Sequence, residues 1–184
     1  MAIIHSNLVW KNHNGLKKLF LNPTDGEKST TSNLLQLNPY TSKLAAALFN
    51  GLEIFPIRSN SNIFLIDEYS NTVLEHISKI ITDGKISHSK NSYDFNKNHD
   101  KIDILYLDLN QNKNILETLK NYEQILKQNG FLIFLYNFQQ NENQNIREEL
   151  QNTLNKLKET FELLQEINLS DFFKSTFMII MTKR

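Results

Sequence analysis

A lysine near the start of a predicted helix is the first residue of this sequence that could do chemistry. The stretch Asn38–Leu48 reads N-P-Y-T-S-K-L-A-A-A-L, and its second half consists of good helix formers. Pro39 disfavours helix just before it, and Thr41 or Ser42 can cap the first turn, which then contains Lys43. The helix dipole disfavours a cation there by roughly a few tenths of a kcal/mol. Lys43 is therefore either a solvated charge or a functional residue.

Three carboxylates lie at or just beyond the carboxyl ends of segments that are predicted to be buried strands: Asp67, Glu68 and Asp108. In an open α/β sheet, ligands bind beyond the carboxyl ends of the strands, so these acids mark the edge where we expect a site. The turn 67–71 contains no glycine, although nucleotide-binding turns normally need glycine so that the backbone can approach the ligand. Its acids would repel a phosphate or carboxylate. They also suit the start of the next helix, so a structural role and a binding role are both open.

Composition limits the class of protein. The chain has 184 residues, of which 40% are hydrophobic, enough for one domain with a small subdomain. A net charge of +0 argues against binding nucleic acid through bulk charge but permits a local basic patch. The absence of cysteine excludes disulfides and cysteine nucleophiles, and the histidines lack metal-ligand spacing, so we expect no metal. Without a membrane-length apolar run or a signal peptide, the protein should be soluble, intracellular and not membrane-bound.

The pattern of segments predicts an α/β fold. Residues 1–37 indicate a small N-terminal antiparallel β subdomain that leans on the larger domain. Residues 38–184 alternate strand and helix, which implies a mostly parallel sheet with helices on both faces and an antiparallel pair at the end. We expect strands at Ile3–Trp10, Leu16–Leu21, Leu34–Leu37, Asn62–Ile66, Lys85–Ser89, Ile102–Leu109, Phe131–Tyr136, Phe161–Leu169 and Phe177–Thr182, and helices at 41–51, Asn71–Thr82, Lys113–Lys127 (ended by Asn129-Gly130) and Ile146–Glu159.

The stretch Asn38–Ala47 resembles the W-N-P-x-R-S-K-L-A-A-A segment of the fibrillarin family, the RNA-guided 2′-O-methyltransferases of C/D-box ribonucleoproteins. The similarity continues in the same order at Leu19–Lys28, Ile63–Ile66, Thr72, His76, Ser78, Asp103–Leu109, Gln111, Asn121 and Leu126–Phe131. The resemblance implies a Rossmann-like S-adenosylmethionine-dependent methyltransferase fold with a small N-terminal β subdomain. It also implies an RNA substrate, rRNA or tRNA, and a Nop5/Nop56/Nop58-type scaffold protein as partner.

Four catalytic positions are implied by the resemblance, and two of them are substituted. Lys43 matches the family's first lysine and Asp108 its aspartate. Asn137 stands where the family has a second lysine, and Thr176 stands where it has a histidine. The first change removes a cation that would stabilise charge at the reacting centre, and the second removes a titratable group.

The implied cofactor site departs further from the family. In the G-A-x-x-G-T loop the glycines are replaced by Asp67 and Asn71, and only Thr72 is kept; Lys90 replaces the acid that would hold the ribose hydroxyls. Between Lys90 and the next strand the family places a helix and a further strand. This chain has too few residues there, so we expect one strand–helix unit to be shortened or lost. Asp94 or Asp100 could substitute for the missing adenine contact.

Three functions remain open at this point. The first is a fibrillarin-like protein with weak or no catalysis, kept for a structural or RNA-contacting role in a ribonucleoprotein. The second is an active RNA 2′-O-methyltransferase in which Lys43 and Asp108 orient and deprotonate the ribose hydroxyl and Lys174 replaces the lost cation. The third is an unrelated Rossmann-like binding module. The family resemblance implies the cytoplasm in an archaeon and the nucleolus in a eukaryote.

Overall fold

The structure is a computed structural model that describes residues 8–13, 16–21, 35–68, 71–90, 100–109, 113–137 and 146–184. The first residues of the expected strand Ile3–Trp10 lie outside this part of the chain, as do Asp94 and Gln111.

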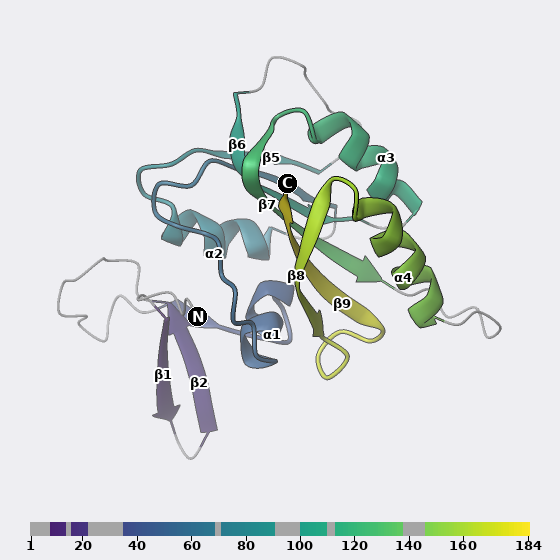
Figure 1. Ribbon diagram of the computed structural model, residues 1–184. Coiled ribbons are helices and arrows are strands. Elements are labelled where there is room, and N and C mark those ends of the chain that lie inside the picture. The colour runs from purple at the N-terminus through teal and green to yellow at the C-terminus, as the bar shows by residue number, and fades with distance from the viewer. Residues whose placement is uncertain are drawn as a thin grey trace.

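Six strands form the main sheet, in the order β5-β4-β6-β7-β9-β8 (Figure 1). Neighbouring strands are parallel except at β9, which is antiparallel to both β7 and β8. This confirms the expected mostly parallel sheet with an antiparallel C-terminal strand. No described strand pairs with the outer side of β5, and residues 91–99, on which the expected loss of a strand–helix unit falls, lie outside the described part of the chain. The strands are β4 (Ile63–Asp67), β5 (Ile86–Ser89), β6 (Ile102–Asp108), β7 (Leu126–Asn137), β8 (Phe161–Asn168) and β9 (Thr176–Lys183).

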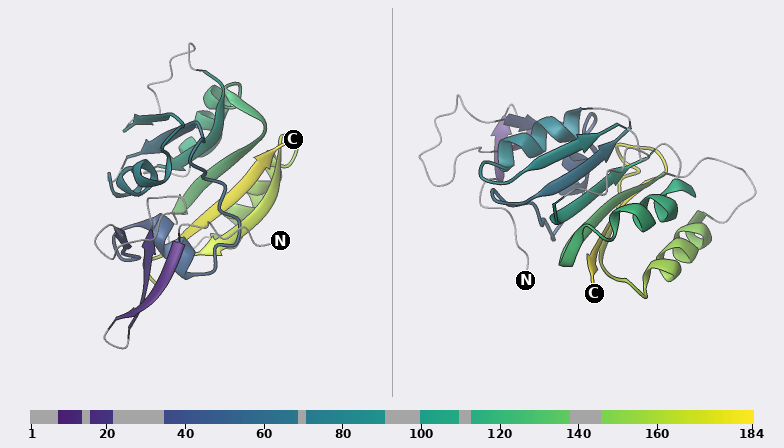
Figure 2. Two further views of the ribbon diagram at one scale, coloured as in Figure 1. Left: turned by 90° about the vertical axis from the view of Figure 1, so that its left-hand side faces the viewer. Right: turned by 90° about the horizontal axis from the view of Figure 1, so that it is seen from above.

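Helices cover both faces of this sheet, as Figure 2 shows in the view from above. Helices α1 (Lys43–Phe49) and α2 (Thr72–Ile80) pack on one face, and α3 (Lys113–Tyr122) and α4 (Ile146–Leu157) pack on the other. Because side chains alternate along a strand, each central strand contributes to both cores. On β4, Ile63 and Leu65 join the α1/α2 core, whereas Phe64 and Ile66 join the α3/α4 core. Strands buried on both faces explain the continuous apolar runs in the sequence.

A separate three-stranded antiparallel sheet precedes α1. It consists of β1 (Leu8–His13), β2 (Leu16–Leu21) and β3 (Leu35–Leu37). Leu19 and Leu37 are buried in the same core as α1, and the Trp10 ring lies edge-on to Phe49 with 4.8 Å between ring centroids. A sheet this small needs such support, since an isolated hairpin is marginally stable in water.

The boundary between α3 and β7 differs from the sequence prediction. The helix ends at Tyr122, and β7 begins at Leu126, so the expected helix Lys113–Lys127 is five residues too long. The Asn129-Gly130 pair does not end a helix. It lies within β7, where Asn129 adopts a φ of 59°. Asparagine tolerates this left-handed conformation well. The conformation occurs at irregularities within strands as well as at helix ends, so the Asn-Gly pair does not by itself indicate a helix end.

Candidate functional site

The carboxyl edge of the main sheet brings two buried acids side by side. Asp67 ends β4 and Asp108 ends β6, and the two residues are partners in the parallel register. Both are buried, at 0% and 2% exposed. The backbone N–H of Glu68 donates to the carbonyl of Asp108 at 3.1 Å, which extends the pairing one residue beyond the strands. The sequence therefore located this edge correctly.

Lys43 reaches across this edge to Asp108. Its Nζ donates to both carboxylate oxygens of Asp108, at 2.6 and 2.8 Å. The lysine side chain is only 13% exposed, so Lys43 is not a solvated charge. Ser42 caps α1 by accepting the N–H of Ala45 at 3.2 Å, which fixes where the helix begins and hence where Lys43 projects. The ring of Phe173 lies beside the ammonium, 5.9 Å from it; nothing in the sequence marked this contact.

Burial dominates the ionisation of Asp108. It raises the pKa of this carboxyl to about 6, although the adjacent Lys43 ammonium and its hydrogen bond act in the opposite direction. The negative charges of Asp67 and Glu68 raise the pKa further. A carboxyl group with a pKa in this range can exchange a proton near neutral pH, which is the property required of a general base.

The two substituted positions lie next to this pair and bind each other. Asn137 ends β7 and Thr176 begins β9, and they are register partners. The Thr176 hydroxyl donates to Oδ1 of Asn137 at 3.0 Å, and Nδ2 of Asn137 donates to the carbonyl of Leu109 at 3.3 Å, one residue after Asp108. All four implied catalytic positions thus meet at one place. Asn137 and Thr176 supply neutral hydrogen-bonding groups there.

Lys174 is two residues before Thr176, and its backbone carbonyl lies 3.2 Å from the Thr176 hydroxyl. Its side chain is exposed and forms no ion pair with a described residue. Within the described part of the chain, no hydrogen bond or ion pair therefore holds the Lys174 ammonium at Asn137, the position of the implied second lysine.

A buried hydrogen bond between α1 and α2 was not expected from the sequence. Oγ of Ser42 lies 3.0 Å from Nδ1 of His76, which is 6% exposed. Burial lowers the pKa of His76, partly offset by Glu75, so the imidazole is predominantly neutral at pH 7. His76 thus positions the helix that carries Lys43. Ser42 and His76 are 34 residues apart, so the sequence gave no indication that they are in contact.

Tyr106 lies under the site with its hydroxyl in the core. The residue is 0% exposed, and the hydroxyl forms no hydrogen bond with a described residue. Burial and the charges of Asp108 and Asp67 raise its pKa well above the ordinary value. An unsatisfied buried hydroxyl costs about 1–3 kcal/mol, so Tyr106→Phe should raise the free energy of unfolding in urea by about 1 kcal/mol. Tyr40→Phe, at a residue 71% exposed, is the control and should change it by less than about 0.5 kcal/mol. A loss of stability in Tyr106→Phe would contradict this reading.

The implied cofactor positions surround the same edge. Asn71 precedes α2 with a φ of −95°, Thr72 begins that helix, and Lys90 follows β5 with its side chain exposed. A cavity of about 530 Å³ opens here between β5 and α2; it is lined by Phe64, Asn71, Leu74, Ser87, His88, Ser89 and Lys90. Neither Asp67 nor Asp108 is among these lining residues.

Asp100 is not at this edge. It pairs with Lys85 at 3.2 Å, and Lys85 precedes β5, so both residues lie at the amino end of the sheet. Asp100 therefore cannot replace an adenine contact at the carboxyl end.

Two features that are absent from the described residues bear on the class of site. No group of three or more histidine and carboxylate side chains in this part of the chain is arranged to hold a metal ion. None of its helices combines the length and apolar character needed to cross a membrane.

Comparison with models of protein families finds no match. Comparison with curated proteins finds fibrillarin-like rRNA/tRNA 2′-O-methyltransferases. The protein from Pyrobaculum aerophilum is 42% identical over 52 residues, which are 28% of this chain and 22% of that protein. The protein from Pyrobaculum islandicum is 23% identical over 179 residues, covering 80% of this chain and 76% of the relative. The stronger identity therefore spans only about a fifth of the relative's length, and the longer match is more distant.

Solved structures of fibrillarins have a fold similar to that of this chain. The fibrillarin pre-rRNA processing protein of Methanococcus jannaschii has a TM-score of 0.79 and 20% identity, covering 97% of this chain and 98% of that one. A fibrillarin/Nop5p complex matches at 0.79 with 18% identity over 97% and 98%. Fibrillarin of Aeropyrum pernix, with natively bound S-adenosyl-L-methionine, matches at 0.73 with 18% identity over 95% and 98%. At these identities the structures establish the fold of this chain.

The residues at the implied cofactor positions differ from those that the family resemblance implies. A fully buried aspartate occupies the first glycine position of the loop, where close backbone approach requires the absence of a side chain. Lys90 carries three donors and no acceptor, so it cannot accept hydrogen bonds from ribose hydroxyls as a carboxylate does. Asn71 stands at the second glycine position of the loop. Its backbone has an ordinary negative φ, so the asparagine causes no backbone strain there.

Proposed function

Because this chain is a divergent member of the fibrillarin family, we propose that it serves as an RNA-contacting subunit of a ribonucleoprotein in the rRNA and tRNA 2′-O-methylation machinery. It has weak or no methyl-transfer activity of its own. Its protein partner is a scaffold of the Nop5 type, since the fibrillarin fold has been solved in complex with Nop5p.

The observation that carries the proposal is the contrast between the two halves of the site. On the half that holds the implied catalytic positions, Lys43 and Asp108 form a bidentate ion pair. On the cofactor half, Asp67 fills the first glycine position and Lys90 replaces the ribose acceptor. A methyl donor bound weakly, if at all, limits transfer whatever the state of the reacting groups.

Isothermal titration of the protein with S-adenosylmethionine tests the proposal. We expect no saturable heat with micromolar affinity. The companion assay measures transfer of radiolabelled methyl groups to an RNA in the presence of guide RNA and the scaffold protein, and we expect no product above the level of Asp108→Ala. Micromolar binding, or transfer that Asp108→Ala abolishes, would contradict the proposal.

One observation favours the alternative of an active 2′-O-methyltransferase. The pKa of Asp108, raised by burial to about 6, suits a general base at neutral pH. Lys43 would orient a ribose 2′-hydroxyl, and a carboxylate oxygen of Asp108 would accept its proton. This alternative predicts a methyl-transfer rate that rises with pH through about 6 and levels off above it, because only the deprotonated carboxyl accepts the proton.

A further inference from the structure

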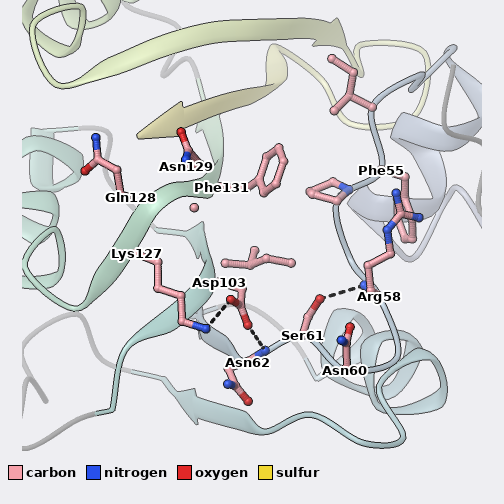
Figure 3. A pocket seen from close by; sticks show the side chains of 14 residues that line it. Phe55, Arg58, Asn60, Ser61, Asn62, Asp103, Lys127, Gln128, Asn129 and Phe131 are labelled. Carbon is pink, nitrogen blue, oxygen red and sulfur yellow. Dashed lines mark hydrogen bonds and ion pairs between the residues drawn. The ribbon is translucent and has the colours of Figure 1, made fainter. Parts of the chain in front are cut away.

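A second cavity opens at the opposite, amino end of the main sheet (Figure 3). Its volume is about 430 Å³, and it lies between the segment 54–62 and the starts of β6 and β7. Asp108, at the carboxyl edge of the sheet, is five positions after Asp103 of this cavity along β6, a span of roughly 17 Å. The cavity is therefore a different place from the site described above. Its size falls within the range of about 300–1,000 Å³ that ligand pockets occupy.

An irregularity in β7 forms one wall of the cavity. The ladder between β6 and β7 passes from Ile102 paired with Leu126 to Ile104 paired with Phe131. Only Asp103 on β6 thus faces residues 127–130 on β7, and this short segment leaves the ladder. At Gly130 a Cβ would lie 2.8 Å from the Lys127 carbonyl, so the fold of this segment requires glycine. Interruptions of this kind change the direction of side chains along a strand, and residues 127–130 line the cavity.

The charges lining the cavity leave one cation uncompensated. Oδ1 of Asp103 accepts a hydrogen bond from Lys127 at 2.6 Å, and Oδ2 accepts the N–H of Asn62 at 2.8 Å. Asp103 and Lys127 therefore neutralise each other. Arg58 is half-buried on the facing wall; its backbone N–H donates to Ser61, and its guanidinium forms no ion pair with any residue in the part of the chain that the structure describes. An anion is the complement of this cavity.

The walls of the cavity also contain an aromatic ring and amide groups, which can stack on a nucleobase and form hydrogen bonds with it. Phe131 is half-buried, and its ring borders the cavity. Figure 3 shows Asn129 near Phe131 on one wall and Asn60 near Arg58 on the other. Both amides are exposed side chains with donors and acceptors, and an aromatic face stacks on any base.

We propose that this cavity binds one nucleotide of a single-stranded RNA, with the phosphate at Arg58 and the base against Phe131, hydrogen-bonded by the Asn129 and Asn60 amides. This contact lies away from the carboxyl edge of the sheet and rests on the proposed RNA-contacting role only in its choice of RNA as ligand. It gives a protein of zero net charge a local cationic contact for an RNA strand.

Fluorescence anisotropy with a fluorescein-labelled ten-nucleotide single-stranded RNA tests the proposal. Arg58→Gln should weaken binding about tenfold and reduce the salt slope by about one, because it removes one phosphate contact. Arg147→Gln, an identical charge change at an exposed residue of α4, is the matched control and should leave the affinity within about twofold. Equal losses in the two variants, or no loss in Arg58→Gln, would overturn the proposal.

A second measurement separates this inference from the proposed function. Titration of the ¹⁵N-labelled protein with uridine monophosphate should shift amide resonances of residues 127–131 and 58–61, and Arg58→Gln should abolish these shifts. If the wild type does not bind the RNA, the proposed function fails, and the mononucleotide titration alone decides the cavity. Shifts confined to these segments would support the site, and their absence would overturn it.

Discussion

Replacing Asp108 with Asn is expected to remove about 3 kcal/mol of the pH dependence of folding stability between about pH 4 and pH 6. In the folded protein burial raises the pKa of Asp108 from 3.8 to about 6. The folded state therefore holds the proton more tightly than the unfolded chain. This contribution to stability is complete below the pKa of the unfolded chain and is lost as the pH rises through the folded pKa. Asn cannot ionise, so the variant lacks this component.

The measurement is urea unfolding of the wild type and Asp108→Asn at a series of pH values, with the free energies subtracted at each pH so that other titrating groups cancel. The free energy of unfolding of the wild type minus that of Asp108→Asn should fall from about pH 4 to pH 6 and remain level above that. A difference that grows with pH would mean that Lys43 outweighs burial and depresses the pKa of Asp108.

Lys43→Met provides the complementary measurement. Lys43 lowers the pKa of Asp108, so its removal should move the pH-dependent loss to higher pH and reduce stability at pH 7 by about 3 kcal/mol. Lys127→Met is the control, because it breaks the more exposed pair with Asp103, whose side chains are 44% and 34% exposed. That change should cost less than about 1 kcal/mol.

The expected loss of stability gives a structural reason for keeping the Lys43–Asp108 ion pair. A buried carboxylate that loses its cation destabilises the fold whether or not the site is catalytic. The Lys43–Asp108 pair can therefore persist in a chain whose cofactor side has changed. The Asn137–Thr176 pair is neutral, so no buried charge depends on it for stability. The two side chains satisfy each other through their hydrogen bond at the positions where the resemblance implies a lysine and a histidine.

The sequence was sufficient to predict the layers of the fold and the sheet edge at which Asp67 and Asp108 lie. The central strands are apolar runs buried on both faces, and the predicted ends of β4 and β6 are within one residue of those observed. Acids at the carboxyl ends of two neighbouring parallel strands must lie together, which is why Asp67 and Asp108 could be placed from the sequence. The three-stranded sheet of the first 37 residues was also predicted, since turn clusters separate its strands.

Features set by contacts between distant residues could not be predicted. Asn129-Gly130 is compatible with a helix end and with an interruption of a strand, and only the pairing of β7 with β6 decides between them. The Ser42–His76 contact and the cavity at Arg58 depend in the same way on how separate elements pack. Asp100 was misplaced because a loop residue was assigned to the wrong end of the sheet.

Restoring the cofactor residues is expected to increase the affinity for S-adenosylmethionine at least tenfold. In the triple variant Asp67→Gly, Asn71→Gly and Lys90→Asp, the first change removes a buried side chain from the loop and the second restores its backbone freedom. The third introduces a carboxylate that accepts hydrogen bonds from ribose hydroxyls. Charge-assisted hydrogen bonds of this kind contribute about 1.5–3 kcal/mol, or roughly ten- to hundredfold in affinity.

Isothermal titration of the triple variant and the wild type measures the gain, with circular dichroism to verify the fold. The double variant Asp67→Gly and Asn71→Gly, which leaves Lys90 in place, is the matched control and should recover only part of the affinity. Lys90→Met removes the cation without adding an acceptor, so by itself it should give no gain. If the folded triple variant binds no better than the wild type, these side-chain replacements are not what limits the binding of S-adenosylmethionine. The backbone beyond β5, at the edge where no described strand follows, would then be the missing element.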